Sequence, residues 1–158
     1  MADLSELYQQ VIIEHNRSPR NYRRVSDATH TAHGDNPLCG DHIDVFLRME
    51  GDRIADVGFQ DAGAQGRGCA ISRASASLMT AAVHGKTAAE AQRLFGAVHA
   101  MLTGAPGGGA EAALGKLVAL SGVRQFPSRV KCASLSWHAL RAALAGEPTP
   151  VTTDSPAD

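Results

Sequence analysis

The chain has 158 residues, 44% of them hydrophobic, so it can bury one core but is too short for two ordinary domains. Its formal net charge of -1 at pH 7 gives no electrostatic reason to expect nucleic acid or an acidic membrane surface as a partner. No stretch approaches the ~20 apolar residues of a membrane span and the start has no signal-peptide pattern, so we expect a cytoplasmic protein.

The N-terminal segment has the pattern of an amphipathic helix. One helical face carries residues at spacings of three and four, namely Leu4, Leu7, Tyr8, Val11, Ile12 and His15. Ser18-Pro19 follows, and a proline disfavours helical conformation in the residue before it. We expect the helix to end there.

Between Ile43 and Phe59 the hydrophobic pattern changes from helical spacing to alternation. Ile43, Val45 and Leu47 would share one face of a first strand, and Ile54 would share a face of the second with Val57 or Phe59. The turn residues Glu50-Gly51-Asp52 separate the two runs, which predicts an antiparallel hairpin. A further strand is expected near Thr29 to His33.

Helices are expected after Cys69. Small residues continue to about His84, where Gly85 ends a closely packed helix. Thr87 and Glu90 have the spacing of a capping box, in which each side chain accepts a hydrogen bond from an otherwise unpaired backbone amide. They predict the start of another helix.

Glycines and a proline between Gly104 and Gly109 indicate a flexible link after that helix. A short helix is expected over Glu111–Leu120 and a last one from about Ser128 to Leu144. The order of elements predicts an α+β domain over residues 1–145, with helices covering one face of a small antiparallel sheet of about three strands. Residues 146–158 have little to bury, and we expect them to form a disordered tail.

The chain has three cysteines, Cys39, Cys69 and Cys132. An odd number does not suit a disulfide framework, and the chain has enough apolar residues not to need one. Cys39 lies in a turn-rich loop, Cys69 directly precedes a predicted helix, and Cys132 lies in the first turns of another. A helix N-terminus and nearby cations favour the thiolate, which is the form that binds zinc and attacks sulfur. Spacing alone leaves two alternatives open: one metal site assembled by the fold, or three unrelated buried thiols.

Asp41, two residues after Cys39, would complete a tetrahedral set of three thiolates and a carboxylate. The alternative is a loop aspartate that accepts backbone hydrogen bonds. The histidines are the other candidate ligands, and His42 beside Asp41 is the first of them to examine, whereas His15 and His99 are better explained as helix-face residues. The full set is His15, His30, His33, His42, His84, His99 and His138.

At these residues the chain resembles the U-type iron–sulfur cluster assembly family, which includes SufU, IscU and the N-terminal domain of NifU. The resemblance extends to about Leu144. Lys131 stands before Cys132 where IscU proteins typically carry a histidine, so the chain looks most like the SufU branch. The matching segments are Leu7-Tyr8 through Pro19-Arg20-Asn21, Asn36 through Asp41, Gly68 through Ser72, Ala74 through Ser77, Phe126-Pro127 and Arg129 through Cys132.

The resemblance implies a SufE/NifU-like fold and a zinc-dependent sulfurtransferase. Cys39, Asp41, Cys69 and Cys132 would be the zinc ligands, and Cys39 would also accept persulfide sulfur after a histidine of the partner replaces it on the metal. The partner would be a cysteine desulfurase, a pyridoxal-phosphate enzyme, and downstream iron–sulfur assembly proteins would follow. Arg129 would pair with the released thiolate or with Asp41, or else be a solvated charge.

An alternative function within the same family is a scaffold on which a [2Fe-2S] cluster is built on the same cysteines. The chain departs from the family pattern in one place: the segment between Phe59 and Cys69 is several residues longer than expected. The glycines there suggest a bulged loop that still lets Cys69 reach the site.

Overall fold

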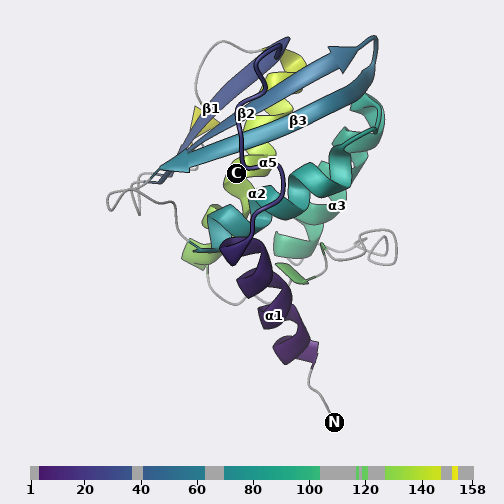
Figure 1. Cartoon of the computed structure of the whole chain (residues 1–158). Helices are drawn as coiled ribbons and strands as arrows, with labels where there is room; N and C mark the ends of the chain where they lie inside the picture. Colours follow the sequence, from purple (N-terminus) through teal and green to yellow (C-terminus); the bar gives the residue numbers. More distant parts are fainter. Residues whose placement is uncertain are drawn as a thin grey trace.

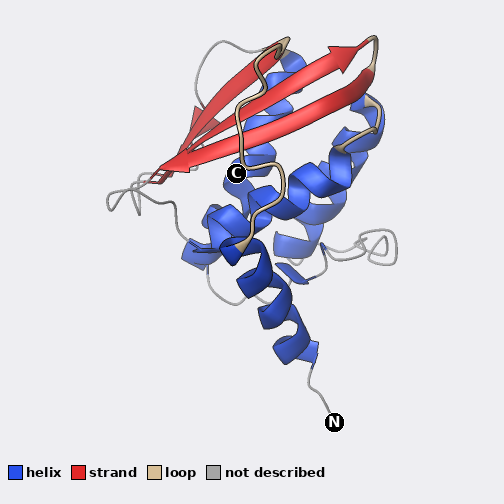
Figure 2. Cartoon of the chain, viewed as in Figure 1, coloured by secondary structure: helices blue, strands red, loops and turns tan. Residues whose placement is uncertain are grey.

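The fold is a sheet with helices packed on one face, as the computed structural model in Figure 1 shows. The structure describes residues 4–36, 41–62, 70–103, 117, 119–120, 127–146 and 151–152. The helices gather below the sheet in the view of Figure 2. In chain order the elements are α1 (Leu4–Arg17), β1 (His30–Asn36), β2 (Asp41–Glu50), β3 (Arg53–Ala62), α2 (Ala70–Val83), α3 (Ala88–Thr103), α5 (Pro127–Ala145) and β4 (Val151–Thr152).

The sheet has the strand order β3-β2-β1-β4, and β2 pairs antiparallel with both β1 and β3. This confirms the predicted hairpin and the strand expected before it near Thr29 to His33. Gly51 follows the last residue of β2 with a φ of 62°, a conformation that glycine adopts at little cost. Glycine at this position therefore allows the tight turn between β2 and β3.

The sequence left open whether Val57 or Phe59 faces inward with Ile54, and the structure buries all three completely. The register explains this, because Arg48 pairs with Asp56 while Met49 pairs with Ile54. The extra residue on β3, Ala55, is a β-bulge that shifts the alternation by one position. Ile54 before the bulge and Val57 and Phe59 after it consequently share the inner face.

The helical layer packs on this inner face. α5 contacts β1 and β2, α2 contacts β3 and α5, α3 packs on α5, and α1 packs on α2. The bounds of α1, α2, α3 and α5 confirm the predicted helices at these places, and the Thr87–Glu90 capping box forms with both hydrogen bonds at 3.1 Å. The largest completely buried side chains are Trp137, Phe59, Ile43, Leu47, Ile54, Met79, Met101, Leu102, Leu120, Leu135, Leu140 and Val45.

The segment between α1 and β1 runs along β3 and onto the outer face of the sheet. The amide of Phe59 donates to the carbonyl of Asn21, and the guanidinium of Arg24 lies 5.0 Å from the ring centroid of Phe46. A Cβ atom at Gly58 would collide with the carbonyl oxygen of Arg23 and lie 3.2 Å from Val25 Cγ2. Gly58 therefore permits the close approach of this segment.

Gly58→Ala is expected to lower the free energy of unfolding by about 1–3 kcal/mol, because the backbone of the crossing segment must shift. Gly96→Ala is the matched control. A Cβ at this position in α3 meets nothing within 4 Å, so alanine should raise stability by about 0.5–1 kcal/mol through helix propensity. Urea denaturation of both variants measures the difference, and equal effects would contradict the packing described here.

The C-terminal segment differs from the expectation at two residues. Val151 and Thr152 form β4, which pairs parallel with Gly34 and Asp35 of β1. An edge strand presents unpaired amides and carbonyls to any extended segment nearby, so even a short polar stretch can pair with it. The expectation of disorder is therefore wrong for Val151 and Thr152. Residues 147–150 and 153–158 lie outside the described part of the chain.

Other expectations fall outside the described residues. They concern the link at 104–109 and most of the short helix at 111–120, of which the structure describes Leu117, Ala119 and Leu120, all buried. Among the described helices, none combines the length and the apolar character needed to cross a membrane.

Candidate metal centre

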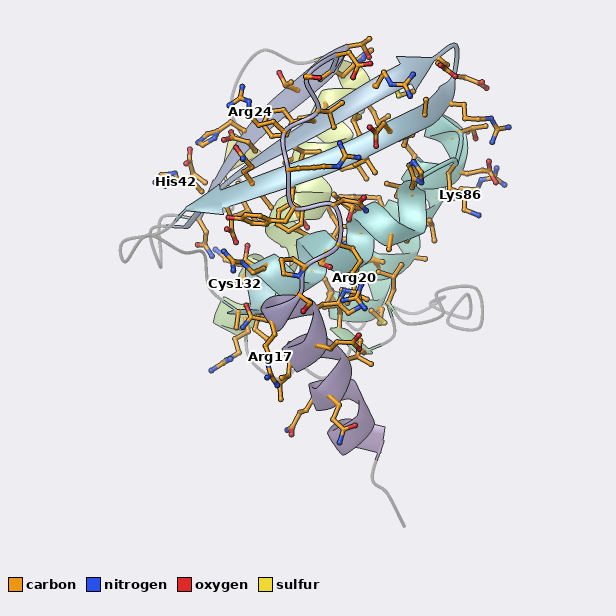
Figure 3. The ribbon with its side chains drawn as sticks, in the orientation of Figure 1. Arg17, Arg20, Arg24, His42, Lys86 and Cys132 are labelled. Atoms are coloured by element: carbon orange, nitrogen blue, oxygen red, sulfur yellow. The ribbon has the colours of Figure 1, made fainter. Side chains whose placement is uncertain are left out.

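Cys132 is the one predicted thiolate ligand within the described residues. It is the sixth residue of α5, a helix that begins with Pro127, where the ring's fixed φ suits the first turn. The Cys132 side chain is buried, with 8% of the residue exposed, and Asn36 Nδ2 donates a hydrogen bond to its Sγ at 3.3 Å. Figure 3 shows Cys132 below the sheet.

Asn36 ties the β1–β2 hairpin to this cysteine. It is the last residue of β1, is 1% exposed, and pairs across the ladder with Asp41, the first residue of β2. Cys39 belongs to the connection 37–40 between them, which lies outside the described residues. Asn36 therefore holds beside Cys132 the end of the hairpin that carries the predicted ligands Cys39 and Asp41.

Cys69 also lies outside the described residues, immediately before the first residue of α2, Ala70. α2 packs against α5, and Ser75 Oγ donates to the carbonyl oxygen of Ala133, the residue after Cys132. The helix that follows Cys69 and the strand that precedes Cys39 thus both contact the same turn of α5. Arg129, one turn before Cys132 on α5, is exposed.

The donor chemistry in this region suits zinc. Zinc binds thiolate, imidazole and carboxylate ligands in a tetrahedron, and Cys132 supplies a buried sulfur with an amide donor beside it. A hydrogen bond from a neighbouring amide stabilises a thiolate and orients a ligand, as second-shell groups do in metal sites. Asn36 was not predicted for this role, because its contact joins residues 96 positions apart in the sequence.

A buried ion pair, also unpredicted, joins the two sides of the segment that contains Cys69. Arg73 of α2 donates to both carboxylate oxygens of Asp61 of β3, from Nε at 3.1 Å and from a terminal nitrogen at 2.8 Å. Tyr22 donates its hydroxyl to Asp61 at 2.7 Å, and the Arg73 guanidinium lies 4.8 Å from its ring centroid. Asp61 and Arg73 side chains are 1% and 8% exposed.

This arrangement has clear electrostatic consequences. Hydrogen bonds to Asp61 raise the pKa of Arg73 despite its burial, and burial together with the Asp61 hydrogen bond raises the pKa of the Tyr22 hydroxyl. Both groups therefore keep their protons at neutral pH. We call Tyr22, Asp61 and Arg73 the clamp, because Asp61 precedes and Arg73 follows the segment 63–69.

The helical histidines make structural contacts. His15 is buried, and its Nδ1 lies 2.7 Å from Ser77 Oγ, which also accepts the backbone amide of Arg20 at 2.8 Å. His99 stacks on Phe95 with ring centroids 5.9 Å apart. These contacts agree with the helix-face interpretation of both residues.

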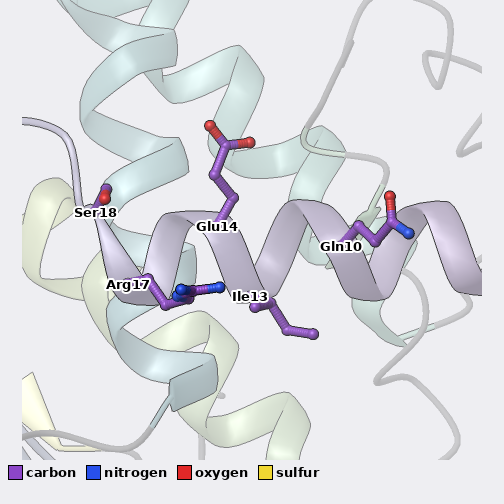
Figure 4. A pocket seen from close by; sticks show the side chains of 5 residues that line it. All are labelled: Gln10, Ile13, Glu14, Arg17 and Ser18. Carbon is purple, nitrogen blue, oxygen red and sulfur yellow. The ribbon is translucent and has the colours of Figure 1, made fainter.

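An open hollow lies along α1 (Figure 4). Its lining consists of Gln10, Ile13, Glu14, Arg17 and Ser18, and Ile13 is half exposed. None of the predicted ligands belongs to this lining. The hollow therefore shares no residue with the predicted metal site.

The comparison with protein families matches residues 7–144 to the NifU-like N terminal domain. The chain is 40% identical over 146 residues to the zinc-dependent sulfurtransferase SufU of Bacillus subtilis, covering 92% of this chain and 95% of the relative. It is 36% identical over 144 residues to the iron–sulfur cluster assembly scaffold protein IscU of Streptococcus pyogenes, covering 91% and 86%.

A solved structure has the same architecture. It is a putative iron–sulfur cluster assembly scaffold protein for the SUF system from Fervidobacterium islandicum, with a TM-score of 0.78 and 31% identity. The match covers 90% of this chain and 99% of that structure. The matched range and the α+β fold agree with the resemblance seen in the sequence.

Proposed function

Because this chain belongs to the NifU-like N terminal domain family, we propose that it is a zinc-dependent sulfurtransferase of iron–sulfur cluster assembly in the cytoplasm. It accepts persulfide sulfur from a cysteine desulfurase on Cys39 and passes it to later assembly proteins. The observation that carries the proposal is the hydrogen bond from Asn36 to Cys132 Sγ. It joins the hairpin containing Cys39 and Asp41 to the helix containing Cys132.

Cys39 and Cys69 are each separated from a described residue by a short stretch of chain, which permits the four ligands to meet. Cys39 follows Asn36 by three residues, so their Cα atoms are at most ~11 Å apart, and Cys69 is one residue, ~3.8 Å, from Ala70. Asp41 is the ladder partner of Asn36. These constraints support a site in which Cys39, Asp41, Cys69 and Cys132 surround one ion.

Zinc, when bound, keeps its cysteine ligands deprotonated and lowers the reactivity of a coordinated sulfur. Cys69 and Cys132, which precede and follow the starts of α2 and α5 in sequence, would be the ligands that stay on the ion. Cys39, between Pro37 and Gly40, would be the ligand that a histidine of the docked partner replaces. Such an exchange would expose the Cys39 thiolate only in the complex.

The sulfur transfer is a thiol exchange. The Cys39 thiolate attacks the outer sulfur of the desulfurase persulfide, forming a bond from Cys39 to that sulfur. The sulfur–sulfur bond of the partner breaks, and its cysteine leaves as a thiolate. The proton stays on the transferred sulfur or exchanges with solvent, and no external oxidant or reductant is required.

Arg129 is the cation proposed to assist this step. It is exposed on the first turn of α5, one helical turn before Cys132. A guanidinium at that place can pair with the departing Cys39 thiolate or with Asp41. An exposed arginine can also reach a docked partner, so its substitution should affect the transfer more than the fold.

Two measurements on the purified protein test the proposal together. Elemental analysis determines the metal content, and a cysteine desulfurase assay with and without the protein determines whether sulfide or alanine production accelerates. We expect at least one zinc per chain, held by the cysteine site, and clear acceleration. Zinc without acceleration would contradict the sulfurtransferase function while leaving the metal site in place.

A scaffold function is the second candidate, and the similarity to IscU of Streptococcus pyogenes favours considering it. Reconstitution with iron and sulfide distinguishes the two. A stable visible chromophore that is transferred to an apo-acceptor would support the scaffold. Failure to retain a cluster, combined with acceleration of the desulfurase, would support the sulfurtransferase.

A further inference from the structure

Two short repeats of the pattern His-x-Asp lie opposite each other on β1 and β2. They are His33-Gly34-Asp35 and His42-Ile43-Asp44. The antiparallel register pairs His33 with Asp44 and Asp35 with His42. Residues two apart on a strand and residues directly paired across strands share a face, so two imidazoles and two carboxylates are brought together.

This group is on the outer face of the sheet. Ile43 and Val45, which alternate with it on β2, are completely buried against the helices, and Asn36 on β1 is turned toward Cys132. His33, Asp35, Asp44 and His42 are all partly exposed. Figure 3 shows His42 pointing outward at the end of the sheet where β2 begins. The group therefore lies across the sheet from the cysteine region and is open to solvent.

The side chains have the geometry of a partly assembled ligand set. One atom each from His33, Asp35 and His42 lies within 4.8 Å of the others, and His33 Nε2 is 2.9 Å from Asp35 Oδ1. His42 Nδ1 also contacts Asp35 Oδ1, and the two imidazole rings are stacked with centroids 5.6 Å apart. An ion ~2.1 Å from each ligand atom requires ligand separations of about 3.4 Å, which small side-chain rotations provide.

Asp44 supplies the feature that separates this group from an ordinary surface ion pair. Its Oδ1 accepts a hydrogen bond from His33 Nδ1 at 2.7 Å. Histidines that bind metals through one nitrogen usually donate the other N–H to a carboxylate, which fixes the ring and its tautomer. Asp44 therefore leaves His33 Nε2 as the nitrogen that faces Asp35 and His42.

We propose that His33, Asp35 and His42 form a second metal site, with Asp44 as the outer partner of His33, and that it binds a first-row divalent cation of the zinc class. Two imidazoles and one carboxylate suit such cations, whereas Mg²⁺ and Ca²⁺ prefer oxygen ligands throughout. Three protein ligands leave a coordination position open to water or another ligand. The site is independent of the cysteines.

The charges support cation binding. Burial acts to raise the pKa of Asp35, but the hydrogen bonds from His42 and His33 outweigh it and lower this pKa, so the carboxylate is ionised at neutral pH. Burial acts to lower the pKa of His33, but its hydrogen bonds to Asp44 and Asp35 outweigh it and raise this pKa, so Nε2 carries a proton that a cation can replace. The two carboxylates beside the imidazoles attract such a cation. The ion takes the place of the proton on His33 Nε2, so binding releases protons.

The test counts Zn²⁺ equivalents on the full-length chain without a histidine tag, by equilibrium dialysis and elemental analysis. His42→Gln and His33→Gln should each bind one equivalent fewer than wild type. Asp44→Asn should retain the equivalent with affinity weakened by about 10–100-fold. Excess Mg²⁺ should not displace it.

His84→Gln is the matched control, because His84 is a half-exposed histidine whose Nε2 lies 4.0 Å from a carboxylate oxygen of Asp56 but belongs to no such group. It should bind as many equivalents as wild type. Circular dichroism confirms that each variant is folded. The proposal would be overturned if the His33 and His42 variants bound zinc with the same stoichiometry and affinity as the His84 control. It would also be overturned if the wild type bound no zinc beyond the equivalent held by the cysteines.

Discussion

Cys39→Ala is expected to reduce the cysteine desulfurase rate in the presence of this protein to that of the desulfurase alone. Alanine has no sulfur to receive the persulfide, so the partner's cysteine stays blocked and its turnover is not accelerated. The measurement is the rate of alanine and sulfide formation at fixed desulfurase concentration, with increasing amounts of wild type or variant. A large loss is expected because the acceptor atom itself is removed.

The control for this experiment must keep the acceptor and leave the metal region unchanged. His84→Gln does so, since His84 follows the C-terminal end of α2 whereas Cys69 precedes its N-terminal end. It should accelerate the desulfurase as wild type does. Undiminished acceleration by Cys39→Ala would rule out Cys39 as the sulfur acceptor. Loss of acceleration in both variants would point to docking rather than chemistry.

Breaking the clamp is expected to have the second large effect. Asp61→Asn or Arg73→Met should lower the free energy of unfolding by about 3–5 kcal/mol, because each leaves the other charged side chain buried without its partner. Both hydrogen bonds of the Arg73 guanidinium to Asp61 lie in a site where the side chains are almost completely buried. Urea denaturation monitored by circular dichroism measures the change.

Two further variants make the clamp prediction specific. Arg48→Met removes ion pairs with the exposed carboxylates of Asp27 and Glu50 and should change stability by less than about 1 kcal/mol. The double variant Asp61→Leu with Arg73→Met removes both buried charges and should recover much of the loss. If the single clamp variants were as mild as Arg48→Met, the pair would not be stabilising the fold.

The clamp also bears on the metal region. Asp61 and Arg73 lie on either side of the segment 63–69, and Arg73 is one helical turn beyond Cys69 in sequence. Loosening this pair should therefore weaken zinc retention as well as stability. Zinc content after dialysis against a mild chelator, compared between Arg73→Met and Arg48→Met, measures that effect.

The elements predicted from local pattern are those whose signal lies within a few residues. Helical spacing predicted α1, alternation predicted the β2–β3 hairpin, and Thr87 with Glu90 predicted the start of α3. The inward positions of β3 were only partly predictable. The bulge at Ala55 depends on pairing with β2, and no property of β3 alone reveals it.

Features that depend on tertiary contact could not be predicted. β4 pairs through its backbone with the edge of β1, and its two residues are too few to form a pattern of alternation in the sequence. The contacts Asn36–Cys132 and Tyr22–Arg73 join residues 96 and 51 positions apart. The two His-x-Asp patterns are visible in the sequence, but only the β1–β2 register brings them together.

The cysteine site itself was predicted from its ligand chemistry and from the family resemblance. Their spacing was uninformative, because the fold rather than the local sequence must assemble ligands 30 and 63 residues apart. Cys132 and its contact with Asn36 are described, whereas Cys39 and Cys69 are outside the described residues. The set Cys39, Asp41, Cys69 and Cys132 therefore stays a prediction.

The most direct test of the central proposal is mass spectrometry of the zinc-loaded protein after incubation with a cysteine desulfurase and cysteine. The intact protein should gain the mass of one sulfur atom, and peptide mapping should place it on Cys39. Removal of the persulfide from the desulfurase, followed by incubation without cysteine, should abolish the gain. Sulfur found only on Cys69 or Cys132, or no gain while the desulfurase persulfide persists, would contradict the proposed transfer.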